Sequence, residues 1–207
     1  NVITNNERLM REKVIKYLEV FFDENLNFYD HADYIIRKYS QKVNFIARVS
    51  KNISFSTKIL LYNAIAVPHL QFCSTLLYLL PNFKVDQFQI VQNRAMRCIL
   101  KCNKYTPVIV MLNVLNMLSV KQKVMFNVMV FIFKIKNKML PEYICDKVKV
   151  FRDVHNYFTR NQHDFILLER CHTSQMLNSI LYKGLYDFNQ LLTNIKDCEI
   201  YLCLNYY

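Results

Sequence analysis

The sequence predicts a mainly α-helical protein with a short β segment near its N-terminal end. Glycine occurs once and proline four times in 207 residues, which is too little turn chemistry for a strand-rich sandwich or barrel. The hydrophobic fraction is 53%, so the chain can bury a substantial core. Apolar residues recur every three or four positions over long stretches, as they do in helices that bury one face.

A strand is expected first, over residues 14–22, because this stretch is rich in β-branched and aromatic side chains. Asp30 can then cap a helix of about twenty residues, whose apolar positions keep helical spacing. Arg37 and Arg48 share a second face of that helix, since an offset of eleven residues returns to nearly the same angle.

The next helix is expected to begin at Ser54 or Ser56, residue types that favour helix N-termini. Pro68 should kink or end it, because its nitrogen cannot donate and its ring clashes with the preceding turn. Residues 70–80 are expected to continue as helix.

The window 59–80 contains no charged residue and has enough apolar residues to be considered as a membrane span. Its polar residues cluster toward the middle, where they would be costly in a bilayer. They are Asn63, His69, Gln71, Ser74 and Thr75. We therefore favour a buried helical hairpin or a kinked helix and expect no membrane partner, with a membrane span as the alternative.

A basic stripe is expected on a third helix, over residues 85–101. Its apolar side chains recur every three or four residues and form a buried face. Cationic side chains follow the same rhythm one residue out of step, about 100° round the helix. They are Arg94, Arg97, Lys101 and Lys104. The stripe can reach a phosphate backbone, or it is a solvated face that keeps the protein soluble.

Three further helices are expected along the chain. Thr106-Pro107 begins a short apolar one that runs to Leu118. Ser119 caps the next, Val120 to about Lys136, which is apolar on nearly every side and is therefore a central core element. Leu140-Pro141-Glu142-Tyr143 opens another. Residues 151–174 lack clear periodicity, and residues 176–192 return to helical spacing interrupted at Gly184.

The net charge of +11, from 27 basic and 16 acidic residues, suggests a polyanionic partner, most simply nucleic acid. A basic protein that is merely soluble stays open as the alternative. The charge is spread along the chain, which argues against a polybasic membrane anchor. The chain begins at Asn1 without a visible signal peptide and looks like a fragment. Its seven cysteines are expected to be reduced, in the nucleus or cytoplasm.

Residue sets that carry catalysis are missing from the sequence. One glycine cannot build a phosphate-binding loop, and no Asp-Asp pair stands ready to hold two divalent cations. The cysteines and histidines lack zinc-site spacing. We expect no catalytic residues, no metal site and no cofactor in this chain.

Landmark segments in a fixed order carry a resemblance. Lys16-Tyr17-Leu18-Glu19-Val20 is followed by Asp23, Leu26 and His31, a few residues apart. Farther along come Leu61-Tyr62-Asn63, Pro68-His69-Leu70, Cys73-Ser74-Thr75, Gln92-Asn93-Arg94-Ala95-Met96-Arg97 and Leu140-Pro141-Glu142-Tyr143. The ordered set resembles the region after the polymerase active site in non-LTR (LINE-type) retrotransposon reverse transcriptases. That family normally has glycine where this chain has Glu19, and glycine tolerates backbone angles that glutamate resists.

The resemblance implies three parts: the end of the palm in residues 1–27, a helical thumb-like domain in 28–150 and a C-terminal extension in 151–207. The parent would be an RNA-directed DNA polymerase that needs Mg²⁺, with its catalytic aspartates elsewhere, so this chain alone should be inactive. Its partners would be the RNA/DNA template–primer duplex and the missing fingers–palm part. The candidate backbone contacts are Arg94, Arg97, Lys101, Lys104, Arg37 and Arg48.

A protein of another class is the alternative: a non-enzymatic helical interaction protein derived from a transposon remnant. Such a protein would expose an apolar patch for a protein partner and would have no affinity for nucleic acid.

Overall fold

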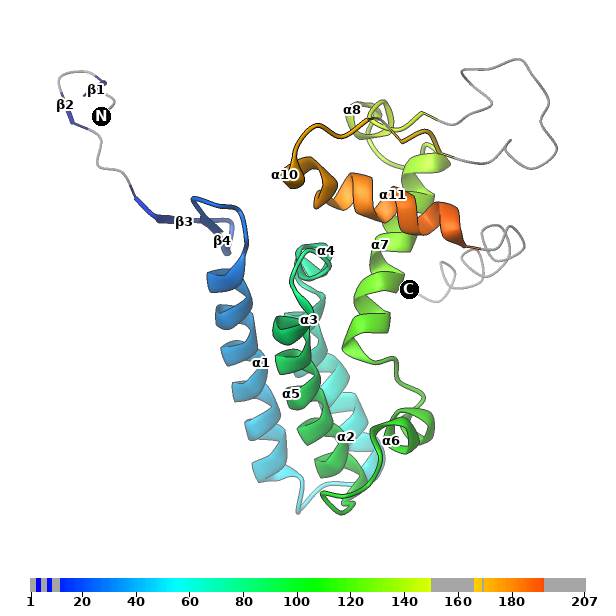
Figure 1. The fold of residues 1–207 in the computed structure, drawn as a ribbon. Coiled ribbons are helices and arrows are strands. Elements are labelled where there is room, and N and C mark those ends of the chain that lie inside the picture. Colours follow the sequence, from blue (N-terminus) through cyan, green and yellow to red (C-terminus); the bar gives the residue numbers. More distant parts are fainter. Residues whose placement is uncertain (1–2, 5–6, 9–11, 150–165, 169, 192–207) are drawn as a thin grey trace. The chain divides into compact units, whose positions relative to one another are not determined.

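The chain is mainly helical, as predicted, with short antiparallel hairpins at its N-terminal end (Figure 1). A computed structural model describes residues 3–4, 7–8, 12–149, 166–168 and 170–191. The chain forms two compact units, Asn1–Lys121 and Gln122–Tyr207, and each is described by itself. The domain boundaries expected at residues 27 and 150 stay predictions.

The N-terminal strands form two hairpins. β1 (Ile3–Thr4) pairs with β2 (Glu7–Arg8), and β3 (Val14–Tyr17) pairs with β4 (Val20–Asp23). The prediction of one strand over 14–22 is therefore wrong. The chain reverses at Leu18-Glu19, where φ is 46° and 65°. Two successive positive φ angles are typical of a type I′ turn, which favours Asn-Gly. Leucine and glutamate are not typical of such a turn, so no turn was predicted here.

Leu18→Asn is expected to stabilise the first unit by about 0.5–1 kcal/mol, because asparagine tolerates the left-handed conformation better than leucine. Leu18 is 77% exposed, so little packing is lost. Urea unfolding measures the change. Leu60→Asn is the matched control: Leu60 is 67% exposed but lies inside a helix, where asparagine is the poorer residue. An equal shift of the midpoint in both variants would contradict the turn argument.

The loop after β4 is organised by Asp23 and leads into α1 (Tyr29–Val49). The Asp23 carboxylate accepts hydrogen bonds from the backbone N–H groups of Asn25, Asn27 and Phe28, at 3.0, 3.1 and 2.7 Å. Burial opposes ionisation of Asp23, but these backbone donors together hold its pKa below the usual value.

Asp30 does not cap α1, which corrects the prediction. The N-cap residue is Phe28, and no side chain caps the helix from that position. Asp23 takes the Phe28 N–H, and Asn27 Oδ1 accepts the Tyr29 N–H at 3.0 Å. Two residues that precede the helix thus accept the backbone N–H groups at its start. Asp30 lies in the first turn of α1.

Pro68 lies inside a helical run and does not end it. α2 (Phe55–Leu61) continues as a π-helical turn, η1 (Tyr62–Ala66), and then as α3 (Val67–Gln71). The Val67 N–H donates to the Tyr62 carbonyl, five residues back. This wider π-helical turn shifts the hydrogen-bond pattern of the helix by one residue just before the proline. At the start of the run, Ser54 Oγ accepts the Thr57 N–H at 3.2 Å, which confirms a predicted cap.

The single helix expected over residues 70–80 is wrong, because the chain breaks at Phe72-Cys73. Cys73 has φ 50°, and only α4 (Ser74–Leu77) follows. The window 59–80 is thus divided among short segments. Within the described residues no single helix is long and apolar enough to cross a membrane, and only the bent pair of 108–115 with 120–136 matches a span in length and composition.

The core of the first unit lies between α1, the α2–α3 run and α5 (Asn82–Leu100). α6 (Val108–Leu115) follows and packs on α5. Each large apolar side chain buried here contributes about 1.5–3 kcal/mol. The fully buried members include Ala32, Val43, Ala66, Phe88, Ala95 and Met96. Inside this core the hydroxyls of Tyr39 and Tyr62 form a hydrogen bond of 2.8 Å, which satisfies two buried polar groups.

α7 (Val120–Lys136) has the predicted bounds, and its residues from Gln122 on belong to the second unit. Its buried residues there include Val124, Val128, Met129, Ile132 and Phe133, as expected of a core element. α8 (Glu142–Cys145) begins after Pro141, as predicted. The irregular segment expected over 151–174 lies mostly outside the described residues.

Gly184 lies inside α11 (Ile180–Gln190), so the prediction that it interrupts the helix is wrong. The break falls earlier, at Asn178-Ser179, between α10 (Ser174–Leu177) and α11. A Cβ atom on Gly184 would lie 2.8 Å from Ile132 Cδ1 and 3.0 Å from Val128 Cγ1. The glycine therefore permits a close approach to α7, which outweighs its poor helix propensity.

Candidate nucleic-acid interface

Net positive charge is highest in the helical part of the chain, because acidic residues are rare there, although the basic residues themselves are spread along the chain as expected. Sixteen of the 27 basic residues lie between residues 34 and 141, with a single acidic residue, Asp86. This stretch carries a formal charge of +15, whereas the remaining residues together carry −4. The distribution is visible in the sequence, and a count of acids by segment would have found it.

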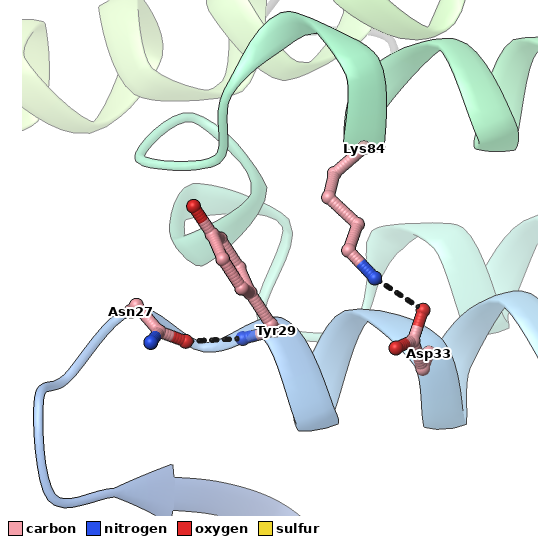
Figure 2. A network of polar contacts seen from close by, with 4 residues as sticks. All are labelled: Asn27, Tyr29, Asp33 and Lys84. Carbon is pink, nitrogen blue, oxygen red and sulfur yellow. Dashed lines mark hydrogen bonds and ion pairs between the residues drawn. The ribbon is translucent and has the colours of Figure 1, made fainter.

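α1 and α5 run parallel and are tied together by two polar contacts. Lys84 Nζ lies 2.6 Å from Asp33 Oδ1 near their first turns (Figure 2). Farther along, Arg94 Nη1 donates to Asn44 Oδ1 at 3.1 Å. The two contacts are eleven residues apart on α1 and ten on α5, so the helices stay in register over about three turns.

The first contact is partly withdrawn from water. The side chain of Lys84 is 11% exposed, whereas that of Asp33 is 58% exposed. Lys84 Nζ also lies 5.6 Å from the centre of the Tyr29 ring, and Tyr29 meets Phe83 edge to face at 6.0 Å. Lys84 thus helps to fix the starts of both helices, and its ammonium group is not available to bind a ligand. The sequence did not indicate this role.

The second contact brings the predicted cations of two helices together. Arg37 and Arg48 lie seven residues before and four after Asn44, so all three share one face of α1. Lys101, seven residues after Arg94, is the C-cap residue that follows α5, with φ 53°, and we group it with the same side. We name this set the basic seam: Arg37, Arg48, Arg94 and Lys101. All four side chains are exposed.

The remaining two predicted residues differ from the basic seam. Arg97 is half-buried, and its Nε is buried without a hydrogen-bond partner among the described residues, so only the far end of its guanidinium can meet a ligand. Lys104 lies beyond α5 in an exposed loop, with Nζ 4.9 Å from the centre of the Tyr105 ring. Helical spacing in the sequence could not distinguish these two residues from Arg94, because it does not show which side chains other elements cover.

The polar residues beside Arg94 in the sequence have a structural role. Gln92 is 4% exposed; its Nε2 donates to the Leu118 carbonyl at 2.9 Å. Gln89 Nε2 donates to Gln92 Oε1 and to Asn93 Oδ1, both at 2.9 Å, and Gln89 Oε1 accepts the Val120 N–H at 2.9 Å. This network holds the segment after α6 against α5, and it leaves Arg94 to face solvent.

No group of three or more His, Cys, Asp or Glu side chains is placed to hold a metal ion in the part of the chain that the structure describes. Comparisons with protein-family models, with curated proteins and with solved structures found no match. What the basic seam can do chemically is therefore argued from its own geometry: cations on two parallel helices can hold successive phosphates without contacting bases.

Proposed function

We propose that this chain is a piece of a LINE-type retrotransposon reverse transcriptase and that its basic seam grips the backbone of the RNA/DNA template–primer duplex. The observation that carries the proposal is the hydrogen bond from Arg94 to Asn44, which brings Arg94 to the face of α1 that carries Arg37 and Arg48. The order of landmark segments in the sequence supports the same assignment. The protein would act inside the cell, and its fingers and palm would be supplied by the missing part of the polymerase.

The expected binding is electrostatic and does not depend on the nucleotide sequence of the duplex. Cations that neutralise phosphates release condensed counterions, so affinity falls steeply as salt rises. The segment from 34 to 141, with one acid among sixteen cations, provides a positive field that favours a polyanion. The chain would position a duplex but would not form a bond, and we expect it to extend no primer without the catalytic aspartates of its parent.

Arg48→Gln combined with Arg94→Gln is expected to weaken binding of an RNA/DNA duplex about tenfold in low salt. Each lost phosphate contact should also reduce the slope of log affinity against log salt by about 0.9. Fluorescence anisotropy of a labelled duplex over a salt series measures both quantities. Glutamine keeps much of the side-chain length and can still bond to Asn44, so folding should be retained.

Lys147→Gln combined with Lys149→Gln is the matched control, because it removes the same charge from exposed positions of the second unit. The control should change affinity and slope much less than the seam variant. If both double variants weaken binding equally, the seam is only a solvated surface. If the unmodified chain has no affinity for any duplex at low salt, the proposed function is wrong.

A non-enzymatic helical interaction protein is the second candidate, and the outer face of α6 favours it. Ile109, Val110 and Val114 are 67%, 46% and 62% exposed on a helix without a charged residue. An apolar helix face of this kind suits a protein partner. The duplex titration separates the two functions, because an interaction protein of this kind should not bind the duplex at all.

A further inference from the structure

Three cations surround one aromatic ring where the β3–β4 hairpin meets α1. Lys16 Nζ, Arg37 Cζ and Lys38 Nζ lie 5.9, 5.7 and 5.5 Å from the centre of the Tyr34 ring. Phe21 packs against the same ring at 5.1 Å and holds it in place. A ring face attracts cations only modestly. Three like charges this close therefore favour a negative group among them.

Glu19 supplies that negative group. Its Oε1 lies 2.6 Å from Lys16 Nζ, and its Oε2 accepts a hydrogen bond from the Tyr34 hydroxyl at 2.8 Å. The hydrogen bond with Lys16, then that with Tyr34, together with the positive charges of Lys16 and Lys38, lowers the pKa of the Glu19 carboxyl. Both carboxylate oxygens are thus bound by donors from different elements.

Glu19 occupies this place at the cost of an unfavourable backbone. Its φ of 65° lies in the left-handed region that favours glycine. The Lys16 and Glu19 side chains are 46% and 57% exposed, so the cluster is open to solvent. A phosphodiester presents two oxygens that share one negative charge to charged and hydroxyl donors, as a carboxylate does. A backbone phosphate can therefore replace Glu19 without any rearrangement of buried groups.

We propose that Lys16, Tyr34 and Lys38 form a second phosphate site for the nucleic-acid backbone, and that the Glu19 carboxylate fills this site in the free protein. Arg37 belongs to both this cluster and the basic seam, so the two sites form one continuous cationic track. The inference rests on the proposed function, because it takes the same duplex as its ligand. Glu19 then weakens duplex binding by competing for Lys16 and Tyr34.

Glu19→Gln in the full 207-residue chain tests the proposal, because glutamine keeps the length of glutamate without its charge. An RNA/DNA duplex should bind roughly three- to tenfold more tightly, and the salt slope should steepen by about 0.9, as for one added phosphate contact. Glu12→Gln is the matched control, since it removes the same charge from an exposed residue just before β3. Equal changes in both variants would overturn the proposal, as would no change in Glu19→Gln.

A second measurement tests whether Lys16 is the group released. Lys16→Gln should change duplex affinity little in the unmodified chain, where Glu19 holds the lysine. In the Glu19→Gln chain the same substitution should remove most of the gained affinity. A loss of equal size in both backgrounds would overturn the competition. Far-ultraviolet circular dichroism and the thermal midpoint confirm that each variant is folded.

The outcomes separate this inference from the proposed function. If the unmodified chain binds duplex through the basic seam and Glu19→Gln matches Glu12→Gln, only the second site is wrong. If neither the unmodified chain nor Glu19→Gln binds duplex at low salt, the proposed function and the second site are both wrong.

Discussion

Replacing Gln92 with alanine is expected to lower the free energy of unfolding of the first unit by about 2–4 kcal/mol. Gln92 donates to the Leu118 carbonyl and accepts from Gln89, and it is 4% exposed. Alanine removes one hydrogen-bond partner from the partly buried Leu118 carbonyl and Gln89 amide, and it opens a cavity. Each unsatisfied buried group costs about 1–3 kcal/mol, so the loss exceeds that of an ordinary surface change.

Urea unfolding followed by circular dichroism measures the loss, and two further variants identify its cause. Gln87→Ala is the matched control, because Gln87 is an exposed glutamine on the same helix, and it should change stability by less than about 0.5 kcal/mol. Gln92→Glu fills the same volume, but its carboxylate cannot donate to the Leu118 carbonyl. It should therefore be destabilising at neutral pH, despite leaving no cavity.

This prediction assigns distinct roles within Gln92-Asn93-Arg94-Ala95-Met96-Arg97. We expect the glutamine to matter for folding and Arg94 for duplex binding. A Gln92→Ala chain that unfolds at the same urea concentration as Gln87→Ala would contradict the structural role of Gln92. If Gln92→Ala loses duplex affinity without losing stability, Gln92 contacts the duplex and is not a structural residue.

Local signals in the sequence were enough for elements whose ends depend on neighbouring residues. The Ser54 cap and the bounds of Val120–Lys136 were predicted correctly, because capping chemistry and apolar pattern act within one turn. The turn at Leu18-Glu19 was missed because neither residue is typical of its backbone angles. Gly184 was misjudged because its reason is a close contact with Val128 and Ile132, more than fifty residues away.

The candidate site divides in the same way. A helical wheel places Arg94 outward and groups Arg37 with Arg48, but it cannot show that Asn44 joins these two helices. It also cannot show that Arg97 is half-buried or that Gln92 is a core residue. The Tyr34 cluster depends on a hairpin that the sequence did not indicate. Long-range packing decides these points.

His31 is expected to make the first unit less stable as the pH falls below about 6.5. The imidazole is 1% exposed, and both ring nitrogens are buried without a hydrogen-bond partner among the described residues. Burial lowers the pKa of His31 below its ordinary value of 6.5. The folded state therefore binds fewer protons than the unfolded state, and stability falls as the pH drops below about 6.5.

The free energy of unfolding should decrease by up to about 2 kcal/mol between pH 6.5 and pH 5, at no more than about 1.4 kcal/mol per pH unit. Asp23 has a lowered pKa, from 3.8, so its contribution is lost only at lower pH. His69 acts in the same direction as His31, because burial and then the charges of Lys42 and Lys38 lower its pKa. Part of the dependence of the free energy of unfolding on pH should therefore remain when His31 is replaced.

Urea unfolding at pH 5, 6, 7 and 8 tests the role of His31 through His31→Leu, a change of similar volume that removes both ring nitrogens. The variant should be at least as stable as the unmodified chain at pH 7, because no buried polar group is left unpaired. It should also lose less stability between pH 7 and pH 5. His172→Leu, at an exposed position, should keep the full pH dependence. If His31→Leu and the unmodified chain lose the same free energy over this range, the buried imidazole does not cause the acid sensitivity.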